Sequence, residues 1–182
     1  EINYASRSPA GTWTYEPERA SRCPSLTVAS DGTAYVVYAT SPAGTALSDL
    51  YLATRSTAGT WQHERVEGLG YHVDYVCETN VGVSPAGAVH LVYAHAMGLR
   101  HATRPAGGTW AFQNLGTGRG TSLAVDTRGA AHVSFGSPLT YATLDRMAQR
   151  LSPAAQSIDL GPYANALGLT VTTATPDLVE AT

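Results

Sequence analysis

The chain has 182 residues, a formal net charge of −3 and a hydrophobic fraction of 43%. This length suits one domain or a short array of repeats, and the low charged fraction of 14% excludes a charged disordered chain. The acidic balance argues against nucleic-acid binding, which needs a basic surface. All 11 strongly basic residues are arginine, so chemistry that requires lysine is excluded. No apolar run approaches the roughly 18 residues of a membrane span.

A short motif recurs along the chain and gives the predicted elements their order. The first copy, residues 4–7 (Tyr-Ala-Ser-Arg), is followed by Gly-Thr-Trp at 11–13. Further copies stand at 52–55 with 59–61 and at 101–104 with 108–110, while the fourth, at 141–143, lacks the Gly-Thr-Trp. This recurrence indicates that the chain is built from internal repeats.

A second unit lies between these copies and keeps a constant spacing. Each copy has a pair of apolar residues one residue apart, then a turn, then an alternating run. The first apolar residue precedes the start of the second run by nine residues in all four copies: Leu26 and Tyr35, Val81 and His90, Leu123 and His132, and Leu169 and Leu178. The alternation and the Gly-rich turns predict short antiparallel strands throughout, with no sustained helical periodicity.

Four strands per repeat and about 45 residues per repeat are typical of propeller blades. The predicted fold is an all-β, four-bladed β-propeller with four antiparallel strands per blade. It is a single domain over residues 1–182, with repeats at 1–24 plus 166–182, 25–79, 80–121 and 122–165. The N-terminus would supply the third and fourth strands of one blade and the C-terminus its first and second strands, which would close the ring.

The repeated motifs resemble the tandem propeller repeats of secreted proteins from high-GC bacteria. They are distantly similar to sialidase-type blades, although Ser30-Asp31-Gly32 lacks the Trp of the Asp-box. In blade number the chain is similar to hemopexin-type domains. The resemblance covers the whole chain and implies a secreted or periplasmic protein, which we expect to be a monomer.

Residues that recur at one place in several repeats are expected to serve packing. Trp13, Trp61 and Trp110 should fill the gaps between blades. The recurring arginines Arg7, Arg55 and Arg104 should form pairs between strands or blades. His90 and His132, which share the position of Tyr35, are expected to be hydrogen-bonded or exposed strand residues.

The departures from the repeat point to a binding face. The connection at residues 67–79 is the longest and most polar. Alignment of the first strands places Arg22, Cys77, Arg119 and Asn165 at one level, and Cys23, Glu78, Gly120 and Ala166 at the next. In a propeller, both levels line the mouth of the central channel. Two arginines and an asparagine there would suit a carboxylate or another oxyanion.

We therefore expect a binding module whose axial face recognises a glycan or an anionic small molecule, with a protein surface as the second ligand class. The predicted ligand-binding residues are Arg22, Tyr71, His72, Asp74, Tyr75, Glu78, His95, Arg119, Tyr163 and Asn165. The simpler alternative is that Arg22 and Arg119 pair with Glu78, Asp74 or Glu18 and only fix the loops.

The two cysteines leave three interpretations open. Cys23 and Cys77 fall at the same end of neighbouring first strands, so a disulfide is favoured, which would fit an oxidising compartment. Two free thiols are the second interpretation. The third is a copper or zinc site at the channel mouth, with Cys77, His72 and His95 as ligands and Asp74 or Cys23 completing the set.

An enzyme is the competing functional class. His72, Asp74 and Glu78 on the 67–79 loop, with Tyr75, would provide a general base, its orienting carboxylate and a proton donor. No nucleophile elbow, zinc-protease motif or phosphate-binding loop accompanies them. The sequence therefore favours binding over catalysis.

Overall fold

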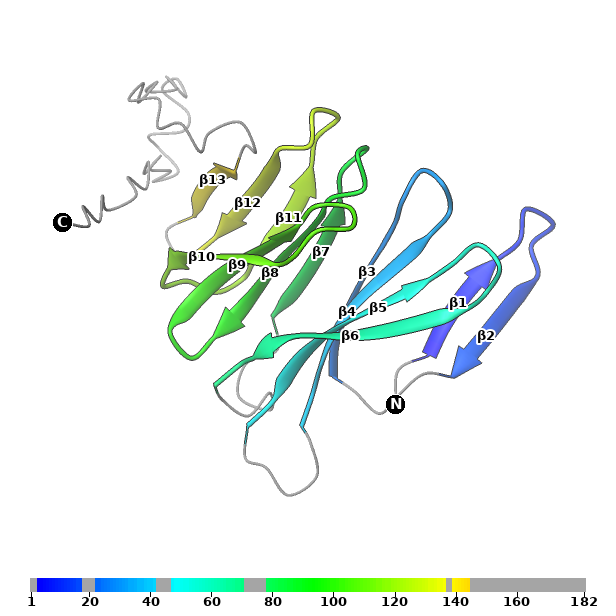
Figure 1. Cartoon of the computed structure of the whole chain (residues 1–182), viewed down its shortest axis with the longest axis horizontal. Coiled ribbons are helices and arrows are strands. Elements are labelled where there is room, and N and C mark those ends of the chain that lie inside the picture. The colour runs from blue at the N-terminus through cyan, green and yellow to red at the C-terminus, as the bar shows by residue number, and fades with distance from the viewer. Residues whose placement is uncertain (1–2, 18–21, 42–46, 71–77, 137–138, 145–182) are drawn as a thin grey trace.

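The computed structural model describes residues 3–17, 22–41, 47–70, 78–136 and 139–144. Over these ranges the chain folds into thirteen strands in four antiparallel sheets, which follow one another in chain order (Figure 1). The prediction of an all-β fold is confirmed. Within the same ranges, no helix is long and apolar enough to cross a membrane.

The four sheets divide the strands as the repeats predict. Sheet A pairs β1 (Asn3–Arg7) with β2 (Trp13–Pro17). Sheet B contains β3 (Arg22–Val28), β4 (Ala34–Thr40), β5 (Asp49–Arg55) and β6 (Trp61–Gly68). Sheet C contains β7 (Thr79–Val83), β8 (Val89–His95), β9 (Gly98–Arg104) and β10 (Ala111–Gly116). Sheet D contains β11 (Ser122–Val125), β12 (Ala131–Phe135) and β13 (Thr140–Leu144).

Each sheet is a meander in which consecutive strands are hydrogen-bonded neighbours. Equivalent tight turns connect the strands, as in the β5–β6 turn, where Gly59 donates its N–H to the Ser56 carbonyl at 2.9 Å. Gly59 has φ +84°, a conformation that a residue with a Cβ rarely adopts. The recurring turn glycines thus set the strand register that the sequence pattern predicts.

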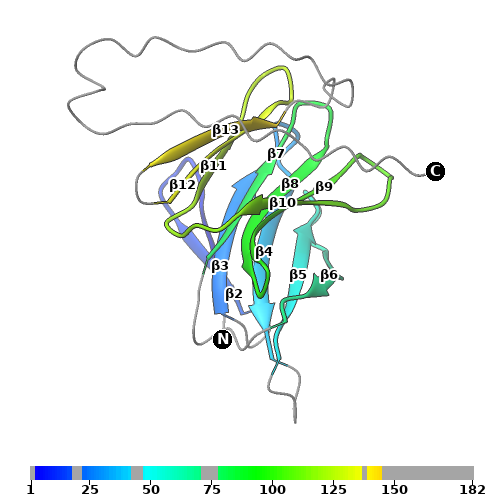
Figure 2. The ribbon, with the colours of Figure 1, turned by 90° about the vertical axis from the view of Figure 1, so that its left-hand side faces the viewer.

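Apolar clusters hold neighbouring sheets together. The largest joins the face of sheet B that contains Leu50 and Leu52 to the face of sheet C that contains Leu91 and Tyr93. A second cluster joins Val92 on sheet C to the sheet D residues Val133 and Phe135. Because side chains alternate along a strand, sheet C contacts sheet B with one face and sheet D with the other. Figure 2 shows the sheets packed in this succession.

The first strands of sheets B, C and D are neighbours in space. The Thr79 hydroxyl on β7 donates a hydrogen bond to the Cys23 carbonyl on β3. On the other side, the Asn80 side-chain amide donates to the Thr121 hydroxyl at 2.7 Å. Strand β7 therefore lies between the starts of β3 and β11, as expected for the inner strands of adjacent blades.

The described sheets form an open series, with sheets A and D at its two ends (Figure 1). Sheet A has two described strands and sheet D has three. The strands that would complete them fall within residues 145–182, outside the described part of the chain. The closed four-bladed ring stays a prediction.

Candidate functional site

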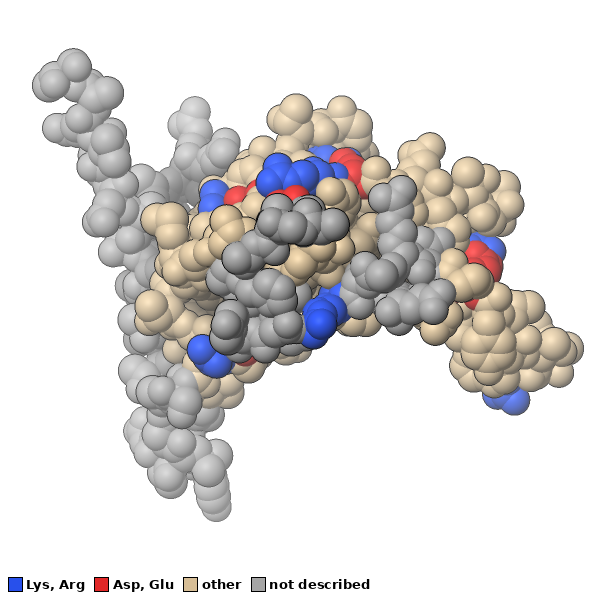
Figure 3. Space-filling model, turned by 90° about the horizontal axis from the view of Figure 1, so that it is seen from below, with Lys and Arg blue, Asp and Glu red and all other residues tan. Residues whose placement is uncertain are grey.

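Three predicted ligand-binding residues lie on one side of the molecule, each at the start of a different sheet. Arg22 begins β3, Glu78 immediately precedes β7, and Arg119 precedes β11. Because these strands run side by side, their starting ends meet at a common edge, which we call the channel mouth because the predicted ring would have its central channel there. Figure 3 views the molecule from this side and shows arginine side chains beside the segments drawn in grey.

Glu78 is fixed at the channel mouth by its neighbours. Its Oε1 accepts a hydrogen bond from the Gly120 backbone N–H at 2.8 Å, across the boundary between sheets C and D. Its backbone carbonyl accepts from the Ala94 N–H at 3.1 Å. The second carboxylate oxygen, Oε2, is buried and has no hydrogen-bond partner within the described ranges. Glu78 therefore presents a positioned acceptor whose hydrogen-bonding capacity is not used by the described chain.

The arginines at the channel mouth differ in their surroundings. Arg119 is exposed, and no described carboxylate forms an ion pair with it. Arg22 is exposed but has an interaction partner. Glu78 pairs with the Gly120 N–H instead of with Arg119, so the structure does not provide the loop-fixing pair predicted between those two side chains.

His95 ends β8, and its Nδ1 accepts a hydrogen bond from the Met97 N–H at 3.1 Å. The other predicted site residues lie outside the described part of the chain: Tyr71, His72, Asp74, Tyr75, Cys77, Tyr163 and Asn165. The catalytic set and the metal set therefore stay predictions. Among described residues, no three His, Cys, Asp or Glu side chains gather closely enough to hold a metal ion.

Cys23 lies on β3 and is not a free cysteine. It has positive φ, +56°, next to the channel mouth. Its predicted disulfide partner, Cys77, lies outside the described residues, so the bridge stays a prediction.

Two of the three repeated arginines, Arg55 and Arg104, join adjacent sheets as predicted, whereas Arg7 donates only to the Gly11 carbonyl of its own turn among the described contacts. Arg55 on β5 donates to Glu16 on β2 through Nε at 2.9 Å and Nη2 at 2.6 Å. The Trp61 indole N–H donates to the same carboxylate at 2.9 Å. Hydrogen bonds from Arg55 and Trp61 hold the pKa of Glu16 below its ordinary value of 4.5. We call this Arg, Trp and Glu arrangement a carboxylate clamp.

A second arginine pair of the same kind joins sheets B and C. Arg104 on β9 contacts Glu64 on β6, with Nη1 2.7 Å from Oε2. The Arg104 guanidinium also lies over the Trp110 ring, 5.0 Å from its centroid. Trp61 and Trp110 therefore lie at joints between sheets, as the repeat predicted.

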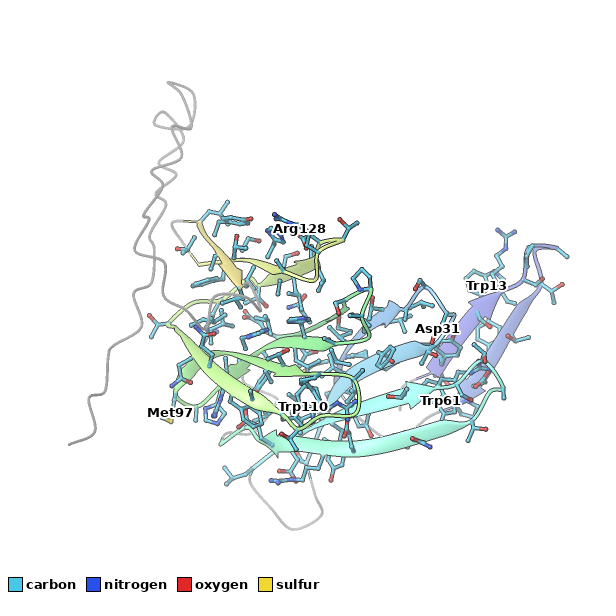
Figure 4. The ribbon with its side chains drawn as sticks, turned by 45° about the horizontal axis from the view of Figure 1, so that its top comes forward. Trp13, Asp31, Trp61, Met97, Trp110 and Arg128 are labelled. Carbon is cyan, nitrogen blue, oxygen red and sulfur yellow. The ribbon has the colours of Figure 1, made fainter. Side chains whose placement is uncertain are left out.

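For Trp13 the prediction is untested, because the gap that it would fill lies between sheet A and the last repeat, which falls within residues 145–182, outside the described part of the chain. Trp13 is 53% exposed, and no described residue from another sheet covers it. Figure 4 shows Trp13 at the outer end of the molecule, on sheet A. The repeat pattern could not reveal this difference in exposure, because Trp13 shares the Gly-Thr-Trp motif with its two partly buried counterparts.

The two strand histidines are hydrogen-bonded, as expected. His90 Nδ1 lies 3.2 Å from His101 Nε2, and both side chains are buried between sheets C and D. Burial, together with His90, lowers the pKa of His101 to about 4. His132 forms its hydrogen bond with the Tyr141 hydroxyl. The contact between His90 and His101 was not predicted from the sequence.

No protein-family model matches the chain, and no curated protein is significantly similar to it.

Proposed function

We propose that the chain is a secreted, four-bladed β-propeller that binds a glycan or an anionic small molecule at the channel mouth. The observation that carries this proposal is the state of Glu78, whose Oε2 is buried and unpaired among the described residues. A sugar hydroxyl would satisfy this oxygen. Arg119, exposed and without a described ion pair, would bind an anionic or hydroxyl oxygen of the same ligand.

The closed ring is supported by a free strand edge in sheet A. Strands β5 and β9 are each paired on both sides, whereas the equivalent β1 has only β2 as a described partner. A further strand on β1 would give sheet A the order seen in sheets B and C. Residues 178–180 have the spacing expected for that strand.

Exposed apolar residues on the neighbouring sheet also support closure. Leu26 and Val28 on β3 are 50% and 55% exposed. Their equivalent on β7, Val81, is 7% exposed because sheet B covers it. In the proposed ring, a first strand that contains Leu169 and Val171 would cover Leu26 and Val28 in the same way.

One hydrogen bond near the cysteines supports the proposed disulfide, and the disulfide in turn supports the proposed export. Thr79, two residues after Cys77, donates its hydroxyl hydrogen bond to the Cys23 carbonyl. This contact would place the two cysteines close enough to bridge, which would fit an oxidising compartment.

The binding proposal is tested with a glycan array that contains neutral and acidic sugars. For a sugar that binds, Arg119→Ala and Glu78→Gln should each weaken affinity by about tenfold, because each removes a charge-assisted hydrogen bond. Arg128→Ala is the matched control. Arg128 is also exposed and pairs with Asp126, but it lies on the turn at the opposite end of sheet D (Figure 4). The glycan form of the proposal fails if no sugar binds, and the channel-mouth site fails if both variants bind as tightly as the unchanged chain.

Ring closure is tested with an engineered disulfide. Val36 pairs with Ala53 in sheet B, so the same register places Val179 opposite Ala5. Ala5→Cys with Val179→Cys should form a bridge within one chain, detected by peptide mapping without reductant. Ser6→Cys with Val179→Cys is the control, because a shift of one residue places the two side chains on opposite faces. A bridge between two chains would contradict the monomeric ring.

A further inference from the structure

Sheet B contains a buried tyrosine whose hydroxyl meets an imidazole. Tyr38 on β4 is 3% exposed, and its hydroxyl oxygen lies 3.0 Å from Nδ1 of His63 on β6. In the His63 tautomer that has its proton on Nε2, the Tyr38 hydroxyl donates this hydrogen bond and Nδ1 accepts it. The phenol proton of Tyr38 is therefore directed at a base inside the fold.

Aromatic contacts connect this pair to a half-buried tryptophan. The His63 and Trp61 rings are stacked, with centroids 6.3 Å apart and planes 22° apart. Trp61 also packs against the apolar cluster that contains Tyr38, and its indole N–H donates to the Glu16 carboxylate at 2.9 Å. Tyr51 stacks on Tyr38, with centroids 5.7 Å apart and planes 13° apart. A continuous series of rings thus leads from Trp61 to the buried Tyr38.

Sheet C provides an internal comparison for this pair. Tyr93 occupies the position equivalent to Tyr38 and is also buried, but its hydroxyl donates to the Glu67 carboxylate. The same carboxylate is paired with Arg100, with Nη1 3.1 Å from Oε2. A carboxylate is a weaker base than a neutral imidazole by about 2 pKa units, and the arginine weakens it further. Tyr38 therefore has the stronger proton acceptor of these two tyrosines.

Sheet D contains another hydrogen bond between a tyrosine and a histidine. The Tyr141 hydroxyl pairs with Nδ1 of His132. Tyr141 is 42% exposed, however, and no tryptophan ring stacks on either side chain within the described ranges. This pair therefore lacks the burial and the aromatic series that distinguish Tyr38 and His63.

We propose that Tyr38 and His63 form a redox-active pair that traps an oxidising equivalent arriving at Trp61. A one-electron oxidant in solution takes one electron from the Trp61 indole and is itself reduced. Tyr38 then gives one electron to the oxidised indole, while its hydroxyl proton moves to His63 Nδ1. The products are a restored Trp61, a neutral tyrosyl radical and an imidazolium ion. A one-electron reductant later restores Tyr38, and the proton returns from His63.

Two features of the site favour this transfer. The Glu16 carboxylate, which accepts the Trp61 N–H, offsets the positive charge of the oxidised indole. Burial of Tyr38 keeps its radical away from other radicals in solution. Every contact that carries the proposal is made between described residues of sheets A and B, and closure of the proposed ring would shield Tyr38 further.

The test uses flash photolysis of the full chain. A laser flash excites ruthenium tris(bipyridine), and a cobalt ammine complex removes its excited electron, which leaves a one-electron oxidant. Transient absorption follows the radicals, and EPR of freeze-quenched samples with ring-deuterated tyrosine identifies those on tyrosine. Exposed tyrosines such as Tyr15 and Tyr141 give radicals that decay rapidly by coupling. We expect an additional, long-lived tyrosyl radical from Tyr38.

Tyr38→Phe should remove the long-lived radical and keep the ring packing. Tyr93→Phe, which removes the equivalent buried hydroxyl of sheet C, is the matched control and should retain the radical, as should Tyr141→Phe. His63→Gln keeps a hydrogen-bond acceptor but not a strong base, so the yield should fall by about tenfold or more. Trp61→Phe should slow formation of the radical, because a phenylalanine ring does not give up an electron to this oxidant.

A native far-UV circular dichroism spectrum in each variant would show that the fold is intact. The proposal is overturned if the unchanged chain gives no long-lived tyrosyl radical, if Tyr38→Phe retains it, or if His63→Gln forms it in the same yield. Loss of the radical in Tyr93→Phe alone would assign it to sheet C and would also overturn the proposal. None of these outcomes depends on Arg119 or on a bound sugar, so this pair and the channel mouth are tested separately.

Discussion

The joints between the described sheets are of two kinds. At the A–B and B–C joints, an arginine on one sheet binds a glutamate on the preceding sheet, as in Arg55 with Glu16. At the C–D joint, both positions have changed. Gln113 occupies the position equivalent to Glu64. In the strand register Gln113 lies opposite His101, as Glu64 lies opposite Leu52. Leu144 takes the place of the arginine.

The C–D joint replaces charge with close packing and a buried His90–His101 hydrogen bond in which the pKa of His101 is lowered to about 4. Val92, Val133 and Phe135 form its buried cluster, and Leu144 packs against them. His101 lies on the same face as Val92, its cross-strand partner, and is also buried. The glutamate and the arginine have thus been lost together, which avoids leaving either charge unpaired in a buried joint. The comparison indicates that a joint between two sheets of this fold can be held either by an Arg–Glu pair or by apolar packing, provided that both partners change together.

The largest expected effect concerns the acid sensitivity of the C–D joint. His101 is neutral in the fold and has its pKa lowered from 6.5 to about 4, chiefly by burial. The unfolded chain binds a proton near pH 6.5, but the folded chain does not until about pH 4. The free energy of unfolding should therefore fall by about 3 kcal/mol as the pH decreases across this window. Urea unfolding at several pH values measures this loss.

His101→Leu, which introduces the residue found at the equivalent position 52, should flatten the profile between pH 6.5 and 5. Gln113→Leu alters the same joint without removing a titratable group, so its profile should keep the slope. A flat profile in the unchanged chain, or an undiminished slope in His101→Leu, would contradict this account.

The second prediction concerns how closely sheets C and D approach each other. Gly82 on β7 faces β11, and a Cβ built on it would lie 2.6 Å from Val125 Cγ2. The equivalent residue on β3 is Thr27. Gly82→Thr should therefore destabilise the chain by about 2 kcal/mol through overpacking, measured by the urea midpoint. Val125→Ala in the same chain should recover part of the loss. A stable Gly82→Thr variant would show that the C–D joint can separate at little cost.

Much of the fold could be predicted from the sequence because the repeats constrain it. The nine-residue offset between Val81 and His90 corresponds to one hairpin of the observed sheet C. Alternation and turn glycines are local signals, and they predict local strand pairing well. Ring closure depends on contacts between the ends of the chain, which no local pattern determines.

The candidate site was harder to predict from the sequence for the same reason. The alignment of first strands correctly brought Glu78 and Gly120 together, since both are fixed by strand register. It could not show that Arg55 faces a glutamate whereas Arg7, at the equivalent place in the repeat, faces none among the described residues. That difference depends on which sheet precedes each one. The pairing of His90 with His101 lies within the β8–β9 hairpin, but the burial of both side chains likewise depends on the neighbouring sheet, which a single repeat does not specify.

The smallest expected effect concerns the clamp itself. Glu16→Gln and Arg55→Leu, which introduce the residue types of the C–D joint, should each destabilise the chain. The double variant should lose less than the sum of the two, with a coupling of about 1 kcal/mol for this bidentate, partly exposed pair. The coupling should shrink in 1 M salt and at a pH low enough to protonate Glu16, since screening and loss of the charge both weaken the pair. A coupling near zero would mean that packing around Trp61 holds the A–B joint. The arginine and glutamate would then fix only the alignment of the two sheets.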